Sequence, residues 1–386
     1  MRENGNLHSL YQSILGFNDL KKHALSFLRS IKAFPYDSLV QEEVATRKRQ
    51  IADVMGGTDQ QWADWKWQYK NRIKDSAALA RILGLSQLEK KRIERVSRVY
   101  RWAVSPYYLS LVGPDYMNSP IYRQAVPDTR ELIPVSSPAP INEAHDAPTP
   151  CLTRKHSGRM TINVTNQCAM YCRHCLRKPT MSQDERHACL EDIESTLDYA
   201  AINSEIREVI ISGGDPFLLG NSTLDFILLE LDKIPHIEKI QIKTRTPATL
   251  PQRITPELCG ILGKYPSINI STQFNHPLEI TPEAQSACAR LIEAGIVVGS
   301  RSVLLPGIND QPNIMRKLDQ ELLKIKVHPQ HISHTQDVEE IGAVQTDSND
   351  GINKIRSLHG YTSDSAIAPH RGRSKILTPR RLPQSQ

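Results

Sequence analysis

The sequence lacks long apolar runs and is poor in aromatic residues. No stretch of its 386 residues approaches the roughly 20 consecutive apolar residues that a membrane-spanning helix needs. The first residues, MRENGNLHSLYQ, contain no apolar segment of the kind that a signal peptide carries. Aromatic residues make up only 6% of the chain, whereas a nucleic-acid reader would need aromatic platforms along a basic stripe. We therefore expect a cytoplasmic protein that spans no membrane and binds no nucleic acid.

Cysteine is scarce and unevenly placed. The chain has seven cysteines, an odd number that does not suggest the disulfide framework of a secreted protein. Three of them, Cys168, Cys172 and Cys175, fall within the run NQCAMYCRHCLRK. The other four are expected to be ordinary buried residues: Cys151, Cys189, Cys259 and Cys288.

The three clustered cysteines have a C-x3-C-x2-C spacing and follow a predicted strand at 160–166. Three thiolates held this closely can ligate three irons of a [4Fe–4S] cluster, which normally takes four cysteines. The fourth iron then keeps an open position where a substrate can bind. On a helix the cysteines would share one face and could instead be core residues. Basic neighbours such as Arg173 and Lys178 favour thiolates, which supports the cluster. The spacing resembles the motif of the radical S-adenosylmethionine (SAM) enzymes.

Strands and helices alternate through residues 154–345. Strands are predicted at 160–166, 208–212, 237–244, 267–274, 296–305 and 328–334. Two of the intervening helices begin Thr-Pro-Glu, at Thr255 and Thr281, because threonine caps a helix well and proline suits its first position. Six such units predict the α/β class and a parallel sheet closed or partly closed as a (β/α)6 barrel, with its chemistry at the carboxyl ends of the strands.

The remaining segments differ from the barrel region in composition and in the spacing of their apolar residues. Residues 1–125 carry apolar residues at helical spacing and predict a helical N-terminal region. Residues 126–153 are rich in proline and polar residues and predict an irregular connector. The barrel is expected over 154–345, and a C-terminal segment over 346–386.

A second segment accompanies the cysteine motif. Ser212, Gly213, Gly214 and Asp215 follow the second predicted strand, and glycines there let the backbone approach a ligand closely. Alone, this segment could be a tight turn between strand and helix. Because it follows the strand next to the cysteine loop, we expect both at the same end of the barrel.

With these motifs the chain resembles the lysine 2,3-aminomutase family of radical SAM, pyridoxal-phosphate (PLP) enzymes. The resemblance covers roughly residues 60–365 and rests on WADWKWQYKNRI, SPYYLSLVGPD, CAMYCRHCLRK, ISGGDP, TRTPATLPQRITPEL, FNHPLEIT and SVLLPGIND. It implies a partial (β/α)6 radical SAM barrel, a [4Fe–4S] cluster, SAM and PLP. It also implies an isomerase that moves an α-amino group to C3 and so forms a β-amino acid.

The resemblance further implies roles for single residues near the cysteines. Cys168, Cys172 and Cys175 would hold the cluster. The segment from Ser212 to Asp215 would hold the amino end of SAM. Arg177 matches the arginine that clamps the substrate carboxylate, a task that suits a planar guanidinium, although it could also be a solvated surface arginine.

For PLP, the resemblance implies one lysine and a pair of basic residues. Lys375, in APHRGRSKILTP, matches the lysine that joins PLP through a Schiff base, or it belongs to a basic tail. Arg159, with Lys155 or Arg154 beside it, matches the residues that hold the PLP phosphate. The alternative for Arg159 is a generic charge at a strand edge.

Departures from the family pattern concern the substrate side chain. Lysine-specific members use two aspartates for the side-chain ammonium; the first position falls here at Gln336, with Asp337 next to it. The second falls near Ile367, where no acid stands. Besides lysine, the family default, glutamate or arginine are therefore possible substrates. Family positions near SAM also change, to Gln273 and Arg301, and the tail with zinc cysteines is missing, so no zinc is expected.

Two other readings stay open. The chain could be a radical SAM enzyme on this scaffold that abstracts hydrogen without PLP. It could also be a relative acting on a protein-bound lysine, or a non-catalytic binding homologue. The family resemblance implies an amino-acid substrate, an electron donor such as flavodoxin or ferredoxin, and a homo-oligomer.

Overall fold

A computed structural model describes residues 38–133, 148–175, 177–178, 184–334 and 370–371, with a few residues between 17 and 29. Three of the candidate residues lie outside this part of the chain: Gln336, Asp337 and Lys375. The backbone of Lys155 is described but its side chain is not. Their roles stay predictions.

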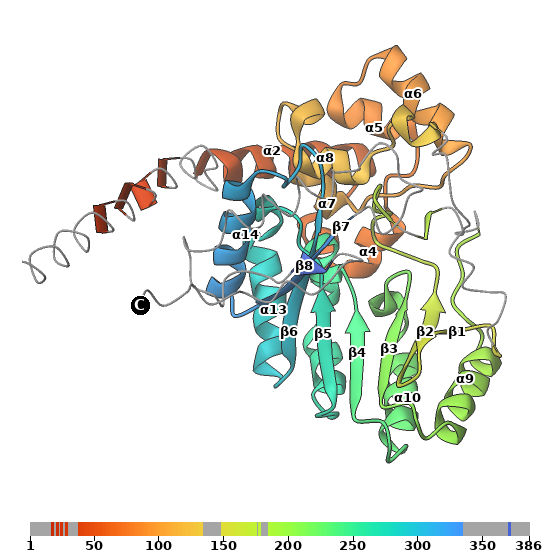
Figure 1. The fold of residues 1–386 in the computed structure, drawn as a ribbon. Coiled ribbons are helices and arrows are strands. Elements are labelled where there is room, and N and C mark those ends of the chain that lie inside the picture. The colour runs from red at the N-terminus through yellow and green to blue at the C-terminus, as the bar shows by residue number, and fades with distance from the viewer. Residues whose placement is uncertain are drawn as a thin grey trace, which may run out of the picture.

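One eight-stranded sheet forms the body of the structure, with its strands in chain order (Figure 1). The strands are β1 (Leu152–His156), β2 (Arg159–Thr165), β3 (Glu208–Gly213), β4 (Lys239–Lys243), β5 (Ile268–Thr272), β6 (Val297–Leu304), β7 (His328–His334) and β8 (His370–Arg371). The first pair is antiparallel and every later pair is parallel. The six strands β2–β7 are the six that the sequence predicts, and they form the partial barrel of the expected α/β class.

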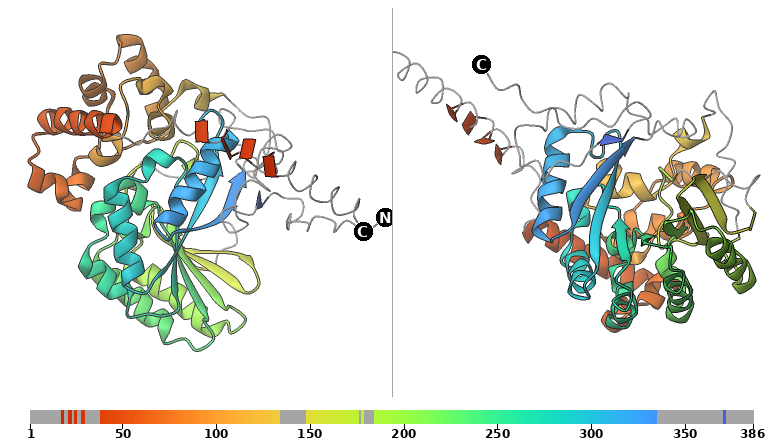
Figure 2. Two further views of the ribbon diagram at one scale, coloured as in Figure 1. Left: turned by 90° about the vertical axis from the view of Figure 1, so that its left-hand side faces the viewer. Right: turned by 60° about the horizontal axis from the view of Figure 1, so that its bottom comes forward.

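Helices line one face of the curved sheet (Figure 2). They are α9 (Leu190–Ile202), α10 (Asn221–Asp232), α11 (Thr246–Thr249), α12 (Pro256–Leu262), α13 (Pro282–Glu293) and α14 (Pro312–Lys324), with short 3-10 turns η4 (Pro216–Leu218), η5 (Pro251–Arg253) and η6 (Pro277–Glu279). As expected, the Thr255 and Thr281 side chains accept hydrogen bonds from Leu258 N and Ala284 N at the starts of α12 and α13.

Alternation along the strands separates the core from the inside of the barrel. Ile240 and Ile242 of β4 are buried in the apolar cluster between sheet and helices. Successive side chains of a strand point to opposite faces, so Gln241 and Lys243 face the inside, where Gln241 bonds to Asn269 of β5 at 3.2 Å. The sheet thus presents a polar inner wall.

The helices before the sheet form a second core. They are α2 (Ser38–Met55), α3 (Asp59–Ala63), α4 (Trp65–Lys70), α5 (Ser76–Leu83), α6 (Gln87–Ser97), α7 (Pro106–Ser110) and α8 (Pro120–Ala125), with 3-10 turns η1 (Tyr116–Asn118) and η2 (Thr129–Leu132). Their apolar cluster includes Trp62, Tyr108 and also Met170 of the cysteine loop. The helices lie beyond the carboxyl ends of the strands (Figure 1). Among the described residues no helix is both long and apolar enough to cross a membrane.

Two local expectations were wrong. β1 starts at Leu152, inside the segment expected to be irregular, because Leu152 and Thr153 are buried and pair with β2. Cys189 is exposed rather than buried, since it stands at the N-cap of α9, ahead of that helix's buried face. The other three isolated cysteines are buried as expected: Cys151, Cys259 and Cys288.

Candidate functional site

The two sequence motifs meet at one cavity of about 330 Å³. Its lining includes Cys168, Cys172, Cys175, Arg177, Ser212, Gly213, Gly214, Asp215, Lys243, Arg245, Gln273 and Arg301. The cysteines come from the loop after β2, and the glycines from the end of β3. The fold therefore gathers the residues that the sequence predicts for the cluster, the SAM amino end and the substrate carboxylate.

The cysteine loop is held by the N-terminal helices. Arg72, two residues after α4, donates from Nη1 to the carbonyl of Cys168 at 2.5 Å. The Tyr171 N–H bonds to Ala103 O at 3.0 Å, and the Arg173 N–H bonds to Gln124 O at 2.9 Å. The thiols are therefore placed by main-chain contacts with a different part of the chain.

The basic residues of the loop act on the thiols but are outweighed by burial. Burial raises the pKa of the Cys175 thiol, and Arg177 and Lys178 lower it by less. Arg173 pairs with buried Glu131, which also binds Lys178 Nζ at 2.7 Å. Burial would raise the pKa of Glu131, but Arg173 and Lys178 lower it. Burial, with Asp215 next, raises the pKa of the Cys168 thiol well above its usual value. Desolvation thus outweighs the basic neighbours at this thiol.

The three thiols fit an iron–sulfur cluster better than a single ion. Within the described residues no group of three or more His, Cys, Asp or Glu side chains is placed to hold one metal ion. In a cluster each thiolate binds a different iron, so the sulfurs need to surround a space rather than a point. Cys168, Cys172 and Cys175 are free thiols on the wall of one cavity, as that arrangement requires.

Glycine is necessary where β3 ends against the cysteine loop. Gly213 has φ of +116°, and a Cβ on it would collide with the carbonyl of Thr165. A Cβ on Gly214 would collide with the carbonyl of Gln167. The Gly214 N–H donates to Thr165 O at 2.5 Å. Only glycines let the two segments touch, which brings Ser212–Asp215 to the cavity.

Both carboxylate oxygens of Asp215 accept hydrogen bonds from neighbouring protein groups. Its Oδ1 accepts from Thr244 Oγ1 at 2.6 Å and its Oδ2 from the Arg245 N–H at 2.9 Å. Burial raises the pKa of this carboxyl. Asp215 therefore joins the end of β3 to the end of β4, and it lines the cavity while doing so.

The candidate substrate and phosphate arginines lie in different places. Arg177 Nη1 donates to Gly213 O at 2.7 Å, at the cavity wall. Arg159 starts β2 and pairs through Nε with Glu208 at 2.6 Å. Arg154 donates to Tyr199 of α9 at 2.8 Å, on the helix-covered side. Neither Arg159 nor Arg154 is among the described residues that line the 330 Å³ cavity.

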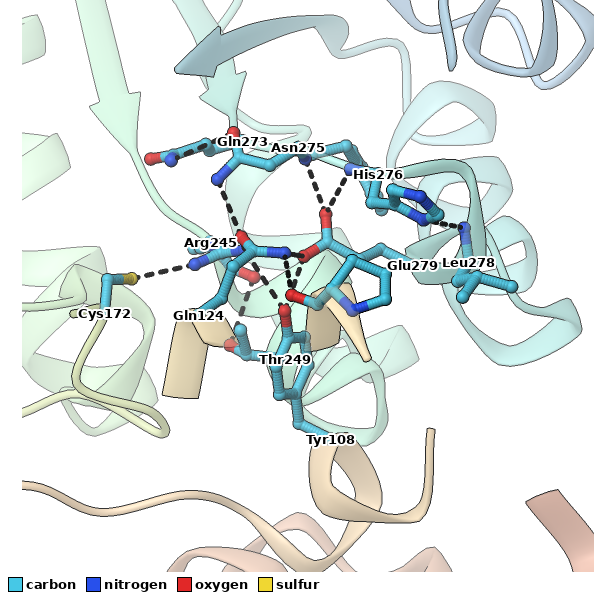
Figure 3. Close-up of polar contacts among 12 residues, drawn as sticks. Tyr108, Gln124, Cys172, Arg245, Thr249, Gln273, Asn275, His276, Leu278 and Glu279 are labelled. Atoms are coloured by element: carbon cyan, nitrogen blue, oxygen red, sulfur yellow. Dashed lines mark hydrogen bonds and ion pairs between the residues drawn. The ribbon is translucent and has the colours of Figure 1, made fainter. Parts of the chain in front are cut away.

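Sequence reasoning missed a buried network centred on Arg245 (Figure 3). Arg245 Nη1 donates to Cys172 Sγ at 2.9 Å. Its Nη2 donates to Glu279 Oε1 and to Gln124 Oε1, both at 2.6 Å. Tyr108 donates to the same Glu279 oxygen at 2.5 Å. The network thus joins a candidate cluster thiol, the barrel and helices α7 and α8.

Burial and charge act in opposite directions within this network. Burial opposes the charge on Arg245, but Cys172, Tyr108 and Glu279 raise the pKa of its guanidinium. Burial, with Glu279 next, raises the pKa of the Tyr108 hydroxyl well above its usual value. The guanidinium therefore stays charged beside the thiol. Its segment, TRTPATLPQRITPEL, marks the family resemblance, but nothing in it singles out Arg245.

Lys243 is the other residue that sequence reasoning missed. It ends β4 and lines the cavity. Burial lowers the pKa of its amine to about 7, and the charges of Arg301 and Arg177 contribute. The available signal was the alternation in KIQIK: two buried isoleucines place the final lysine on the inner face of the strand.

Comparison with known proteins gives the following matches. Residues 162–318 match the family model described as the Radical SAM superfamily. The chain is 40% identical to glutamate 2,3-aminomutase of Clostridioides difficile over 371 residues, 94% of this chain and 88% of that protein. It is 39% identical to L-lysine 2,3-aminomutase of Clostridium subterminale over 80% of this chain and 75% of the relative.

Proposed function

Because the chain belongs to the lysine 2,3-aminomutase family of radical SAM enzymes, we propose that it moves the α-amino group of an amino acid to C3. The product is a β-amino acid and the enzyme is an isomerase. The observation that carries the proposal is the single cavity lined by the three free thiols, the glycine segment and Arg177. Relatives named for glutamate and for lysine make these two amino acids the first candidates for the substrate.

The family cofactors are a [4Fe–4S] cluster, SAM and PLP. When bound, they supply a carbon radical that takes hydrogen from the substrate and a conjugated ring that stabilises the migrating nitrogen. Cys168, Cys172 and Cys175 would hold the cluster, since three soft thiolates on one wall are the appropriate donor set. The segment Ser212–Asp215 would bind the amino end of SAM beside it, because its glycines let the backbone come close.

Arg177 would hold the α-carboxylate of the substrate. One of its N–H groups bonds to Gly213 O, and a guanidinium has five such donors in a fixed plane. The bond to Gly213 orients this plane at the cavity wall. A carboxylate bound there would lie between the cysteine loop and the end of β3, where the substrate must be positioned and shielded from water.

The PLP site is the part of the proposal that rests on the sequence. Lys375 would join PLP, and Arg159 with Lys155 would hold its phosphate. Gln336 and Asp337 would contact the substrate side chain. We further propose a reductant such as flavodoxin or ferredoxin, a homo-oligomeric state and a cytoplasmic location.

The test is anaerobic incubation of the iron-reconstituted protein with SAM, PLP, dithionite and each of the common amino acids. We expect 5′-deoxyadenosine and one β-amino acid. Replacing Cys172 by Ala should abolish both and lower the iron content, whereas Cys288→Ala, a buried cysteine outside the cavity, should leave both intact. Iron retained in the triple cysteine variant, or no 5′-deoxyadenosine with any amino acid, would refute the proposal.

The alternative without PLP has its own readout. If the proposal holds, the protein with PLP shows an aldimine absorbance band that borohydride bleaches, and Lys375→Ala removes the band. Formation of 5′-deoxyadenosine without such a band would favour the PLP-independent reaction.

A further inference from the structure

Lys243 places an amine inside the barrel, and no described residue pairs with it. It stands at the carboxyl end of β4, next to Ser271 of β5 in the parallel register. Within the described part of the chain its amine has no hydrogen bond or ion pair, and the acid whose charge raises its pKa is Glu208, at the start of β3. A desolvated lysine without a partner lowers the stability of the folded state, so its presence calls for a ligand.

Among the described residues around Lys243, cationic side chains outnumber carboxylates. Four cationic side chains line the cavity, namely Arg177, Lys243, Arg245 and Arg301, against one carboxylate, Asp215. Arg245 is paired with Glu279, and Asp215 is bonded to Thr244 and to the Arg245 N–H. No other acidic side chain among the described residues lines the cavity. The cavity therefore has cationic groups for more than one anion.

The residues expected to hold the phosphate of a cofactor start at the other end of the sheet. Arg159, the candidate phosphate residue, pairs in register with Glu208, and Glu208 with Lys239 at the start of β4. The backbone of Lys243 lies four residues further along that strand, roughly 13 Å at the usual rise per residue, on the side of the cysteines. Besides burial, the charge of Arg159 still contributes to the lowered pKa of the Lys243 amine. Arg177 would hold the α-carboxylate of the substrate, and Arg301, which also lines the cavity, would hold the carboxylate of SAM. This leaves Lys243 for a further carboxylate.

We propose that Lys243 binds a carboxylate on the side chain of the substrate, so that the enzyme acts on a dicarboxylic amino acid rather than on lysine. This inference rests on the function proposed above and names its substrate class. A lysine ammonium would meet a like charge in a partly desolvated cavity, which is unfavourable. A carboxylate would form a charge-assisted hydrogen bond with the amine and restore its protonation.

The test uses glutamate and glutamine, which have the same shape and differ in charge. For the enzyme with all its cofactors, kcat/KM for glutamate should exceed that for glutamine and for lysine. Lys243→Met should lower kcat/KM for glutamate roughly 10- to 100-fold, the loss of a hydrogen bond to a charged group, and should abolish the preference over glutamine. Lys243→Arg should retain part of the preference for glutamate over glutamine.

Binding provides a readout that does not depend on turnover. Calorimetric titration of the cofactor-loaded protein with glutamate should show the same 10- to 100-fold weaker binding for Lys243→Met, with iron and PLP content unchanged. Lys239→Met is the matched control, because Lys239 lies on the same strand but is half exposed and pairs with Glu208 at 3.2 Å. It should bind glutamate as the wild type does.

Three outcomes would overturn the inference. One is a wild-type enzyme that isomerises lysine faster than glutamate or aspartate, which would leave the proposed function standing. Another is a Lys243→Met protein that loses PLP absorbance, or loses every amino acid equally, which would assign Lys243 to the cofactor. The third is a Lys243→Met protein that keeps the wild-type preference for glutamate over glutamine. If instead no amino acid yields 5′-deoxyadenosine, the proposed function itself fails.

Discussion

Arg245 and Lys243 stand two residues apart at the end of β4, line the same cavity and are surrounded in opposite ways. The terminal nitrogens of Arg245 bond to Cys172, Gln124 and Glu279. Lys243 has no such bond within the described structure. A buried charge with protein partners holds segments together, whereas one without them costs stability until a ligand arrives. The difference separates a residue that holds the cysteine loop in place from one that we expect to bind the substrate side chain.

The largest effect on stability is expected from removing Arg245. Arg245→Met leaves the Glu279 carboxylate buried without its cation, and such a loss costs about 3–5 kcal/mol. We expect urea unfolding of the iron-free protein to move to a correspondingly lower midpoint. An unfolding free energy within 1 kcal/mol of wild type, by the same measurement, would show that the network is not structural.

A gentler change addresses the bond from Arg245 to the sulfur. Arg245→Lys keeps a positive charge but shortens the side chain, so the Cys172 sulfur loses its donor. Hydrogen bonds to cluster sulfurs stabilise the reduced, more negative form. We expect the cluster reduction potential to fall by roughly 60 mV, the one-electron equivalent of a tenfold change, in a titration followed by electron paramagnetic resonance. An unchanged potential would contradict a role for this bond.

Removing Lys243 should raise the free energy of unfolding, whereas removing Arg245 should lower it. The pKa of its amine falls from the usual 10.5 to about 7 in the native state. Between these values the unfolded chain binds more protons, so wild-type stability rises with pH over that window. Below pH 7 the full cost of the buried charge is present. Lys243→Met should therefore stabilise the cofactor-free protein below pH 7, on the order of 1 kcal/mol.

The pH dependence is the control for this prediction. The advantage of Lys243→Met should shrink as the pH rises through 7 and vanish towards 10.5, because both states of the wild type are then neutral at this amine. Thermal unfolding of the two cofactor-free proteins at pH 6 and pH 9 measures it. Destabilisation at pH 6 would mean that Lys243 has a protein partner.

The smallest effect on stability is expected at an exposed ion pair, which serves as a reference for the buried residues. Arg207 and Glu238 form an ion pair with more than half of each side chain exposed. Exposed pairs contribute little, because water and salt screen them. Arg207→Ala should change the unfolding free energy by less than about 0.5 kcal/mol. A loss comparable to that of Arg245→Met would remove the distinction between buried and exposed cations.

The parallel strands and the cysteine loop could be predicted from the sequence because their signals are local. Alternating apolar residues define β2–β7, and the cysteine spacing and Gly213–Gly214 follow directly after two of those strands. The pairing of Arg245 with Glu279 depends on residues that are distant in the chain and could not be predicted this way. The same holds for the pairing of Arg173 with Glu131, which joins the cysteine loop to η2.

The bonds from Tyr108 and Gln124 to Glu279 bear on how this chain can be divided. A fragment beginning at residue 134 would retain every parallel strand and all three clustered cysteines, yet it would uncover the Glu279 carboxylate and remove the main-chain partner of Arg173. The preceding helices are therefore no detachable module. Grafting the barrel onto another leader, or trimming it for crystallisation, would yield a protein that forms its sheet but cannot keep its sulfur-bearing loop in place.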